Sequence, residues 1–256
     1  MSVEVRRVEP QEAEEFGFII RGMGEQLPRP VEWEEHAHPF HELLWNPRGA
    51  SAIGAGQRVW TVAGAHGLWV PAGTRHTGRA GAGTLYRATF FDPETVAAIS
   101  EAPVGVTITP LLAGLLDYVD TQELTEGERS RAEAVIIDLI RPSGPEVTLH
   151  LPQRDPARGI AETVLEDVAA APSAAEWARR LGISPRTVTR SFQAETGVGY
   201  ARWAAEARVH RALELLPSGM SVAETAEEVG FASSSAFIAA FKRVTGSTPG
   251  AFLPRE

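Results

Sequence analysis

The chain has 256 residues, enough for two modest domains that each bury a core of their own, and its 43% hydrophobic and 22% charged residues are ordinary for a globular protein. It contains no cysteine, which excludes disulfides and thiolate metal sites. The net charge of −9 argues against a nucleic-acid partner only as an average over the chain, because residues 151–256 carry 12 basic and 12 acidic residues and the acidic excess precedes them.

The N-terminal segment, MSVEVRRVEPQEAEEF, is charged from its start and lacks the apolar stretch of a signal peptide. No run in the chain approaches 18 consecutive apolar residues, the length that would indicate a transmembrane helix. We therefore expect a cytoplasmic protein with no membrane partner.

From about residue 30 to residue 95, short runs rich in Val, Trp, Leu and Phe alternate with Gly and Pro, as in QRVWTVAG, HGLWVPAG and TLYRATFFDP. Several short strands separated by turn signals are typical of a β-sandwich or a small barrel. We assign residues 1–105 to such a barrel, with the role of a sensor domain.

The segment HAHPFHE (36–42) holds three of the seven histidines of the chain. On a strand, alternation would place His36, His38 and Glu42 on one face, with Phe40 between them, and His41 on the other. Downstream, PAGTRH supplies His76 just after a Pro-Gly turn. We expect His41 to be a surface or interface residue rather than a ligand, and assign no role to the remaining histidines: His66, His150 and His210.

HAHPFHE, followed by Gly49 and then by PAGTRH, resembles the two motifs of the cupin superfamily. The resemblance implies a divalent metal ion inside the barrel, bound by His36, His38, Glu42 and His76. Ala80 stands where many cupins have asparagine, which leaves the second motif incomplete. Three imidazoles and a carboxylate suit Zn, Fe, Mn, Ni or Cu without choosing among them. Contact of the same histidines with a small organic effector is the alternative.

Residues 106–142 have a helical pattern. Thr125 and Glu128 form a capping box, and the helix that follows repeats apolar residues at one-face spacing. The apolar residues of the two expected helices are Leu111, Leu112, Leu115, Leu116, Ala132, Val135, Ile136 and Leu139. We expect a helical hairpin that forms a homodimer; a hairpin packed within its own domain would show the same stripes. A Pro-rich linker at 143–156 follows.

Residues 157–256 contain an internal repeat, in which SAAEWARRLGISPRTVTRSFQAETG can be laid on SVAETAEEVGFASSSAFIAAFKRVTG. Each copy opens with a capping box, Ser173 with Glu176 or Ser221 with Glu224, and runs one helix to a glycine, Gly182 or Gly230. A glycine can take the left-handed conformation of a tight turn, and a serine, Ser184 or Ser233, can cap the next helix. The pattern predicts two helix-turn-helix units, 173–194 and 221–244, joined by one long helix at YARWAAEARVHRALELL.

The last unit, GFASSSAFIAAFKRVTGSTPGAFL, resembles the C-terminal signature of the AraC/XylS family of transcription regulators. The resemblance covers about 100 residues and implies two recognition helices in successive major grooves of double-stranded DNA. RNA polymerase is a further candidate partner.

The two recognition helices carry different side chains. The first offers arginine and glutamine, which can read guanine and adenine, so we expect it to be the main reader of sequence. The second offers serines and terminal basic residues that suit phosphates, so we expect it to be mainly positional. The candidate DNA contacts are Ser184, Arg186, Thr187, Thr189, Arg190, Gln193, Ser233, Ser234, Ser235, Lys242 and Arg243.

The expected fold is therefore α+β with two domains: a cupin-like or jelly-roll-like barrel with a helical hairpin, then an all-α tandem helix-turn-helix domain. Two functions fit the barrel. One is a transcription regulator controlled by a metal ion or a small-molecule effector; the other is a cupin metalloenzyme, of dioxygenase or isomerase type, with an attached helical domain. The C-terminal repeat favours the regulator, which is not an enzyme.

Overall fold

The computed structural model describes residues 3–7, 19–142 and 146–253. The chain divides into two compact units. A sheet unit comprises Met1–Gly56 and Trp60–Glu146, and a helical unit comprises Gln57–Val59 and Val147–Glu256.

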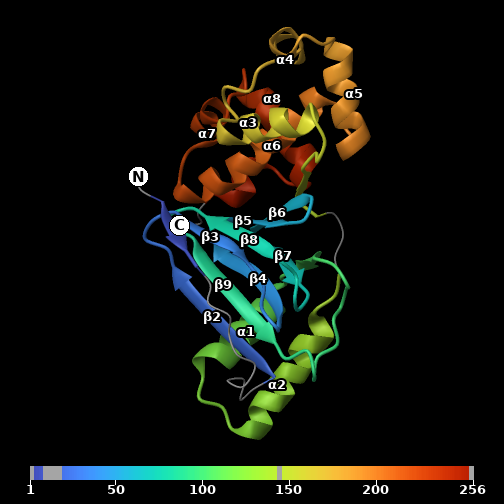
Figure 1. Ribbon diagram of the computed structural model, residues 1–256. Helices are drawn as coiled ribbons and strands as arrows, with labels where there is room; N and C mark the ends of the chain where they lie inside the picture. The colour runs from blue at the N-terminus through green and yellow to red at the C-terminus, as the bar shows by residue number, and fades with distance from the viewer. Residues whose placement is uncertain (1–2, 8–18, 143–145, 254–256) are drawn as a thin grey trace. The chain divides into compact units, whose positions relative to one another are not determined.

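The sheet unit is a curled sheet with two helices (Figure 1). Its strands are β1 (Glu4–Arg6), β2 (Ile20–Gln26), β3 (Val31–His36), β4 (His41–Arg48), β5 (Ala50–Ala55), β6 (Arg58–Ala63), β7 (His66–Val70), β8 (His76–Ala80), β9 (Leu85–Phe91) and β10 (Val104–Thr107). The strand order is β1-β3-β8-β5-β6-β7-β4-β9-β2, with β10 paired to β7. This order begins at β1 and ends at β2, so the two edge strands are not neighbours in the sheet, and an ion pair between Arg6 and Glu25 is the contact between them that the structure shows. The expected barrel is thus a half-barrel, open between these two edges in the part of the chain described.

Alternating side chains give the sheet two apolar faces. On β4, Leu43 and Trp45 pack with Trp69 and Phe91 beneath the helices, while Leu44 packs on the other face. A strand that is buried on both faces has a continuous apolar run in its sequence, as LLW does in β4. The inner face of the curl then holds the candidate site.

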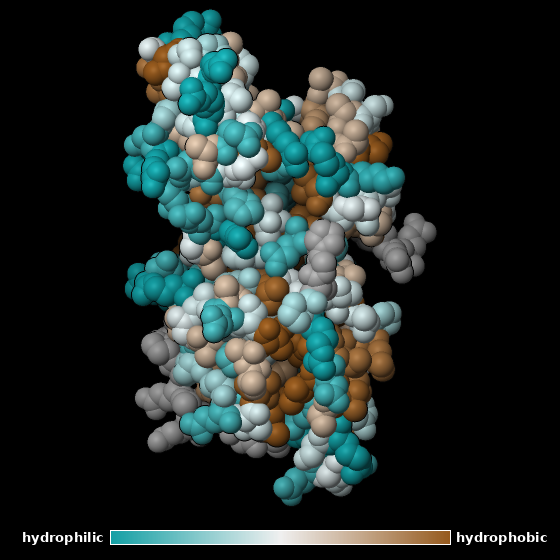
Figure 2. Space-filling view, turned by 90° about the vertical axis from the view of Figure 1, so that its right-hand side faces the viewer, coloured by the Kyte–Doolittle hydropathy of each residue, from teal (hydrophilic) through white to brown (hydrophobic). Residues whose placement is uncertain are grey.

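The two helices of this unit are α1 (Pro110–Thr121) and α2 (Glu126–Leu139). The capping box of Thr125 and Glu128 forms as predicted. Ala132 and Ile136 are buried against the sheet, but Val135 is 44% exposed, so the expected four-residue stripe is only partly buried. Figure 2 shows hydrophobic side chains gathered on one face of the sheet unit.

The helical unit consists of β11 (Thr148–His150), α3 (Ala157–Glu166), α4 (Ala174–Leu181), α5 (Pro185–Thr196), α6 (Tyr200–Leu215), η2 (Leu216–Ser218), α7 (Val222–Glu228), α8 (Ser234–Thr245) and η3 (Pro249–Phe252). β11 lies within the segment expected to be a linker and pairs with β6, whose first residues belong to this unit. No helix in the described ranges is both long and apolar enough to cross a membrane.

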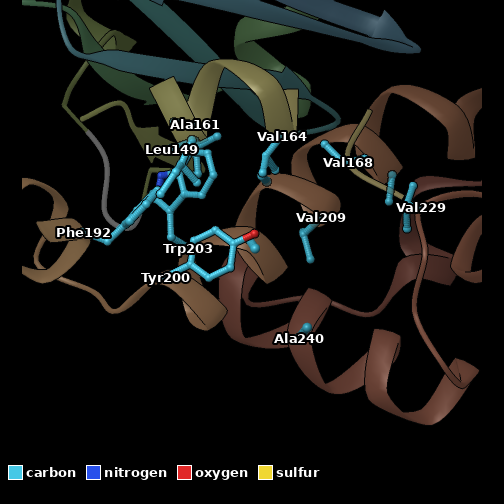
Figure 3. Close-up of a cluster of buried hydrophobic side chains, with 14 of the residues drawn as sticks. Leu149, Ala161, Val164, Val168, Phe192, Tyr200, Trp203, Val209, Val229 and Ala240 are labelled. Atoms are coloured by element: carbon cyan, nitrogen blue, oxygen red, sulfur yellow. The ribbon is translucent and has the colours of Figure 1, made fainter. Parts of the chain in front are cut away.

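Both predicted turns form as expected. Gly182 and Gly230 adopt φ of 65° and 80°, and Ser184 and Ser233 cap the helices that follow. The long helix α6 contacts both α5 and α8. Its Tyr200 and Trp203 enter one apolar core with Phe192 of α5 (Figure 3), so the two helix-turn-helix units share a single packed interior.

Candidate metal centre and DNA-binding helices

Three of the four predicted ligands converge inside the curled sheet. His38 Nε2 lies 3.1 Å from Glu42 Oε2, and His76 Nε2 lies 3.4 Å from the same oxygen. All three side chains are at most 6% exposed, and their candidate ligand atoms lie within 4.8 Å of one another. Ligands about 2.1 Å from a common ion lie about 3–4 Å apart, and both of the imidazole–carboxylate distances fall in this range.

Backbone carbonyls fix the orientation of the imidazoles. The Nδ1 atom of His38 lies 2.9 Å from the carbonyl oxygen of Phe40, and that of His76 lies 2.9 Å from the carbonyl oxygen of Thr74. A carbonyl only accepts hydrogen bonds, so each Nδ1 carries the proton and each Nε2 keeps its lone pair when the ring is neutral. Each Nε2 therefore faces Glu42 as a metal ligand would.

His36 lies beside this group but outside it. Its ring centroid is 4.3 Å from that of His76 and 6.2 Å from that of His38. Its Nδ1 is also held by a backbone carbonyl, that of Glu34, at 2.8 Å. Burial lowers the pKa of His36, which favours the neutral ring. His36 is thus oriented like the other two imidazoles, but its ring is half-buried and further from the carboxylate.

The segment 36–42 is not one strand, contrary to the prediction. β3 ends at His36 and β4 begins at His41, and His38 projects from the intervening loop. Pro39 has no backbone N–H to continue a ladder, which is a physical reason for the break. His41 does point away from the other histidines, but it is 6% exposed rather than a surface residue. The Ala72 N–H donates to His41 Nδ1 at 3.0 Å, and the ring packs on Trp69.

The charges in the group are coupled. Burial by itself would raise the pKa of Glu42, but hydrogen bonds from His38 and His76 outweigh burial and bring the pKa to about 2. For His76, burial lowers the pKa and the hydrogen bond to Glu42 outweighs it, so the pKa is raised. The two shifts together favour an ionised Glu42 carboxylate beside a protonated His76 imidazole.

A cavity of about 340 Å³ opens beside the three residues. Its other walls are mainly apolar: Met23, Trp33, Leu44, Ile53, Tyr86, Ala88 and Phe90. Trp33 and Tyr86 stack with ring centroids 4.7 Å apart, and Arg6 and Glu25 also line the cavity. Sequence reasoning did not single out these residues, although the alternation of Tyr86, Ala88 and Phe90 in TLYRATFF signals one strand face.

In the helical unit, the outward face of α5 carries the residues expected to read DNA. Val188 and Phe192 are fully buried, while the opposite face is exposed. The exposed candidates are Ser184, Arg186, Thr187, Thr189, Arg190 and Gln193. Four of them already make contacts within the helix region. The Ser184 side chain accepts from the Thr187 N–H, Thr189 Oγ1 donates to the Pro185 carbonyl at 3.1 Å, and Gln193 Nε2 donates to the Gly197 carbonyl at 2.6 Å.

The corresponding candidates on α8 are placed in the same way. Phe237 and Phe241 are fully buried, and Ser233, Ser235, Lys242 and Arg243 are exposed. Ser234 is partly buried, which leaves it less available than its neighbours. Ser233 accepts from the Ala236 N–H at 3.2 Å and thus acts as the helix cap.

Comparisons with known families match both units. Residues 28–140 match the family described as the AraC-like ligand binding domain, and residues 177–255 match the helix-turn-helix domain. The two matches fall on the sheet unit that holds the cavity and on the helices α4–α8.

Known regulators resemble the chain over most of its length. The regulator NimR of Escherichia coli is 27% identical over 248 residues, which cover 93% of this chain and 87% of NimR. RipA of Corynebacterium diphtheriae is 29% identical over 82% of this chain and 59% of its own length. The DNA-binding domain of AdpA, solved in complex with a target DNA, is 34% identical over 39% of this chain and 90% of that domain, with a TM-score of 0.36. NimR and RipA are both named as helix-turn-helix transcriptional regulators.

The sheet unit with its cavity, the paired helix-turn-helix units and the two family matches lead to one conclusion. The chain belongs to the AraC/XylS family and is a DNA-binding transcription regulator, with an AraC-like ligand-binding domain followed by a helix-turn-helix domain.

Proposed function

We propose that this regulator binds its operator in response to a divalent metal ion, or to a small organic effector, held in the sheet unit. The observation that carries the proposal is the convergence of two oriented imidazoles and one carboxylate on a single point beside a cavity. A mainly apolar cavity with a few convergent polar groups is the usual form of a small-molecule site.

For the metal, His38, Glu42 and His76 would supply the ligands, and His36 is placed to join as a fourth. The donor set suits Zn, Fe, Mn, Ni or Cu, and each Nε2 offers a lone pair to an ion once its ring is neutral. For an organic effector, the same side chains would supply the polar contacts and the Trp33–Tyr86 pair the apolar wall.

The test is metal content by elemental analysis, after exposure of the purified protein to each of the five metals in turn and gel filtration. The wild type is expected to retain about one ion per chain, and His38→Ala, Glu42→Gln and His76→Ala to retain far less. His66→Gln is the matched control, because His66 is an imidazole of the same unit that lies outside the group. Wild-type protein that retains none of the five metals would leave only the organic effector.

For DNA, we propose that α5 is the main reader of base sequence, through Arg186, Thr189, Arg190 and Gln193, with Ser184 and Thr187 near the backbone. Ser233, Ser234, Ser235, Lys242 and Arg243 of the second unit would fix the register on phosphates. The partner of these helices would be double-stranded DNA, and RNA polymerase would be a second partner of the regulator. Both interactions would take place in the cytoplasm.

For assembly, we propose a homodimer formed through α1 and α2. These helices expose apolar side chains that no described part of the chain covers: Leu111 (60% exposed), Val135 (44%) and Tyr118 (42%).

For the division of the chain, we propose that residues 1–105 are the sensor barrel and that residues 106–142 are the dimerisation segment. Residues 143–156 would be the linker, and residues 157–256 the DNA-binding domain.

A further inference from the structure

The outward face of α8 is apolar at its centre. Ser235, Ile238, Ala239 and Lys242 are exposed and recur at the spacing i, i+3, i+4, i+7, so they share one face of the helix. Ile238 is 38% exposed, and the residue before it, Phe237, is fully buried in the core. An exposed isoleucine does not strengthen a helix, since its propensity is lower than that of alanine or arginine.

The internal repeat shows which face this is. Aligning the caps Ser184 and Ser233 places the buried residues Val188 and Phe192 on Phe237 and Phe241. The same alignment pairs the outward residues as follows: Arg186 with Ser235, Thr189 with Ile238, Arg190 with Ala239, and Gln193 with Lys242. Ile238 and Ala239 thus occupy the positions that in α5 hold the central residues of the reading face.

The chemistry of the major groove narrows what such residues can contact. Guanine, cytosine and adenine present hydrogen-bonding edges there, and an alkyl side chain would take those edges from water without replacing the lost hydrogen bond. Thymine alone presents a methyl group, which apolar side chains contact favourably. The residues at either end of the apolar pair, Ser235 and Lys242, are polar and can contact phosphates or base edges.

We propose that Ile238 and Ala239 read the 5-methyl groups of thymine in the half-site bound by α8. The second unit is then a reader of thymine and not only a phosphate anchor. The proposal rests on the DNA-binding function of the chain, and it deepens the division of labour between the two helices.

The test uses full-length protein and operators selected from random DNA, with the α8 half-site located by footprinting. Each thymine of that half-site is replaced by deoxyuridine, which removes the methyl group alone, and affinity is measured by fluorescence anisotropy. At one or two positions, uracil is expected to weaken wild-type binding about fourfold, which corresponds to about 0.8 kcal/mol for one buried methyl-sized group. Ile238→Ser should lose the uracil penalty at the position that Ile238 contacts, and a penalty that it keeps at a second position is the one due to Ala239.

The control is Arg190→Ala, which lowers affinity through α5 and should keep the full uracil penalty. Operators that tolerate uracil at every thymine of the half-site, or an Ile238→Ser variant that keeps the wild-type penalty at every position, would overturn the proposal. If uracil is tolerated at every thymine, the apolar face of α8 would instead be a surface that binds another protein. Failure to select any operator would instead count against the proposed DNA contacts, so the two failures are distinguishable.

Discussion

Glu42 is a buried carboxylate between two imidazoles, and its surroundings predict how stability depends on pH. Its pKa is about 2 in the folded chain against an ordinary value of 4.5, so its contribution to stability is present above about pH 4.5 and is lost as the pH falls toward 2. The pKa of His76 is raised above 6.5, so its contribution is present below about pH 6.5 and is lost as the pH rises through the folded value. The metal-free pair is therefore most stabilising between about pH 4.5 and pH 6.5.

A metal ion reverses the alkaline half of this profile, because it binds the deprotonated imidazoles and competes with protons. We expect the difference in Tm between zinc-loaded and chelated protein to grow from pH 5 to pH 8. Circular dichroism at unit pH intervals measures it, with Glu42→Gln as the control in which the difference should nearly vanish. A difference that stays constant over this range would mean that zinc does not bind at these histidines.

The two helix-turn-helix turns differ in what surrounds their glycines. Both glycines have positive φ, which costs about 1–2 kcal/mol for a residue with a side chain. A Cβ at Gly182 would meet nothing within 4 Å, whereas a Cβ at Gly230 would lie 2.6 Å from the carbonyl oxygen of Ala169. Gly230→Ala should therefore lower the free energy of unfolding by more than Gly182→Ala does, as urea denaturation can measure. Equal losses would show that the backbone near Ala169 moves aside freely.

The helices α5 and α8 also predict different losses of DNA affinity. Arg186→Ala and Arg190→Ala should each weaken operator binding by about 1–3 kcal/mol and relax preference at one or two base pairs, because a base contact is lost. Lys242→Ala should weaken operator and random DNA alike and reduce the slope of log K against log salt, because a phosphate contact is lost. Titrations at several salt concentrations compare the three variants. Equal losses on operator and random DNA for the arginine variants would contradict the reading role of α5.

The helical unit was the more predictable from sequence, because its signals are local. Capping serines, turn glycines and buried residues such as Val188 and Phe237 lie within one helix-turn-helix unit and act over a few residues. The sheet unit depends on pairing between strands that are distant in the sequence. The histidine motif around His38 could therefore be recognised from the sequence, but its conformation could not. Alternation of side chains predicts one strand over residues 36–42, whereas the structure has a break between His36 and His41, at Pro39. The cavity wall was missed because Trp33 and Tyr86 meet only after the sheet curls.

Control of transcription by a ligand of the sheet unit requires a coupling free energy between ligand binding in that unit and DNA binding by the helical unit. If zinc, as the probe ion, binds the DNA-competent form more tightly than the incompetent form, operator affinity changes when zinc binds. The coupling is reciprocal, so operator DNA must change zinc affinity by the same factor, typically between about 5-fold and 150-fold. Operator affinity measured with zinc and with chelator gives one factor, and competitive zinc titration with and without operator gives the other. In Glu42→Gln the operator affinity should no longer respond to zinc, while in His66→Gln it should respond as in the wild type. Tight zinc binding with unchanged operator affinity would make the ion structural and would assign control to an organic molecule in the cavity beside it.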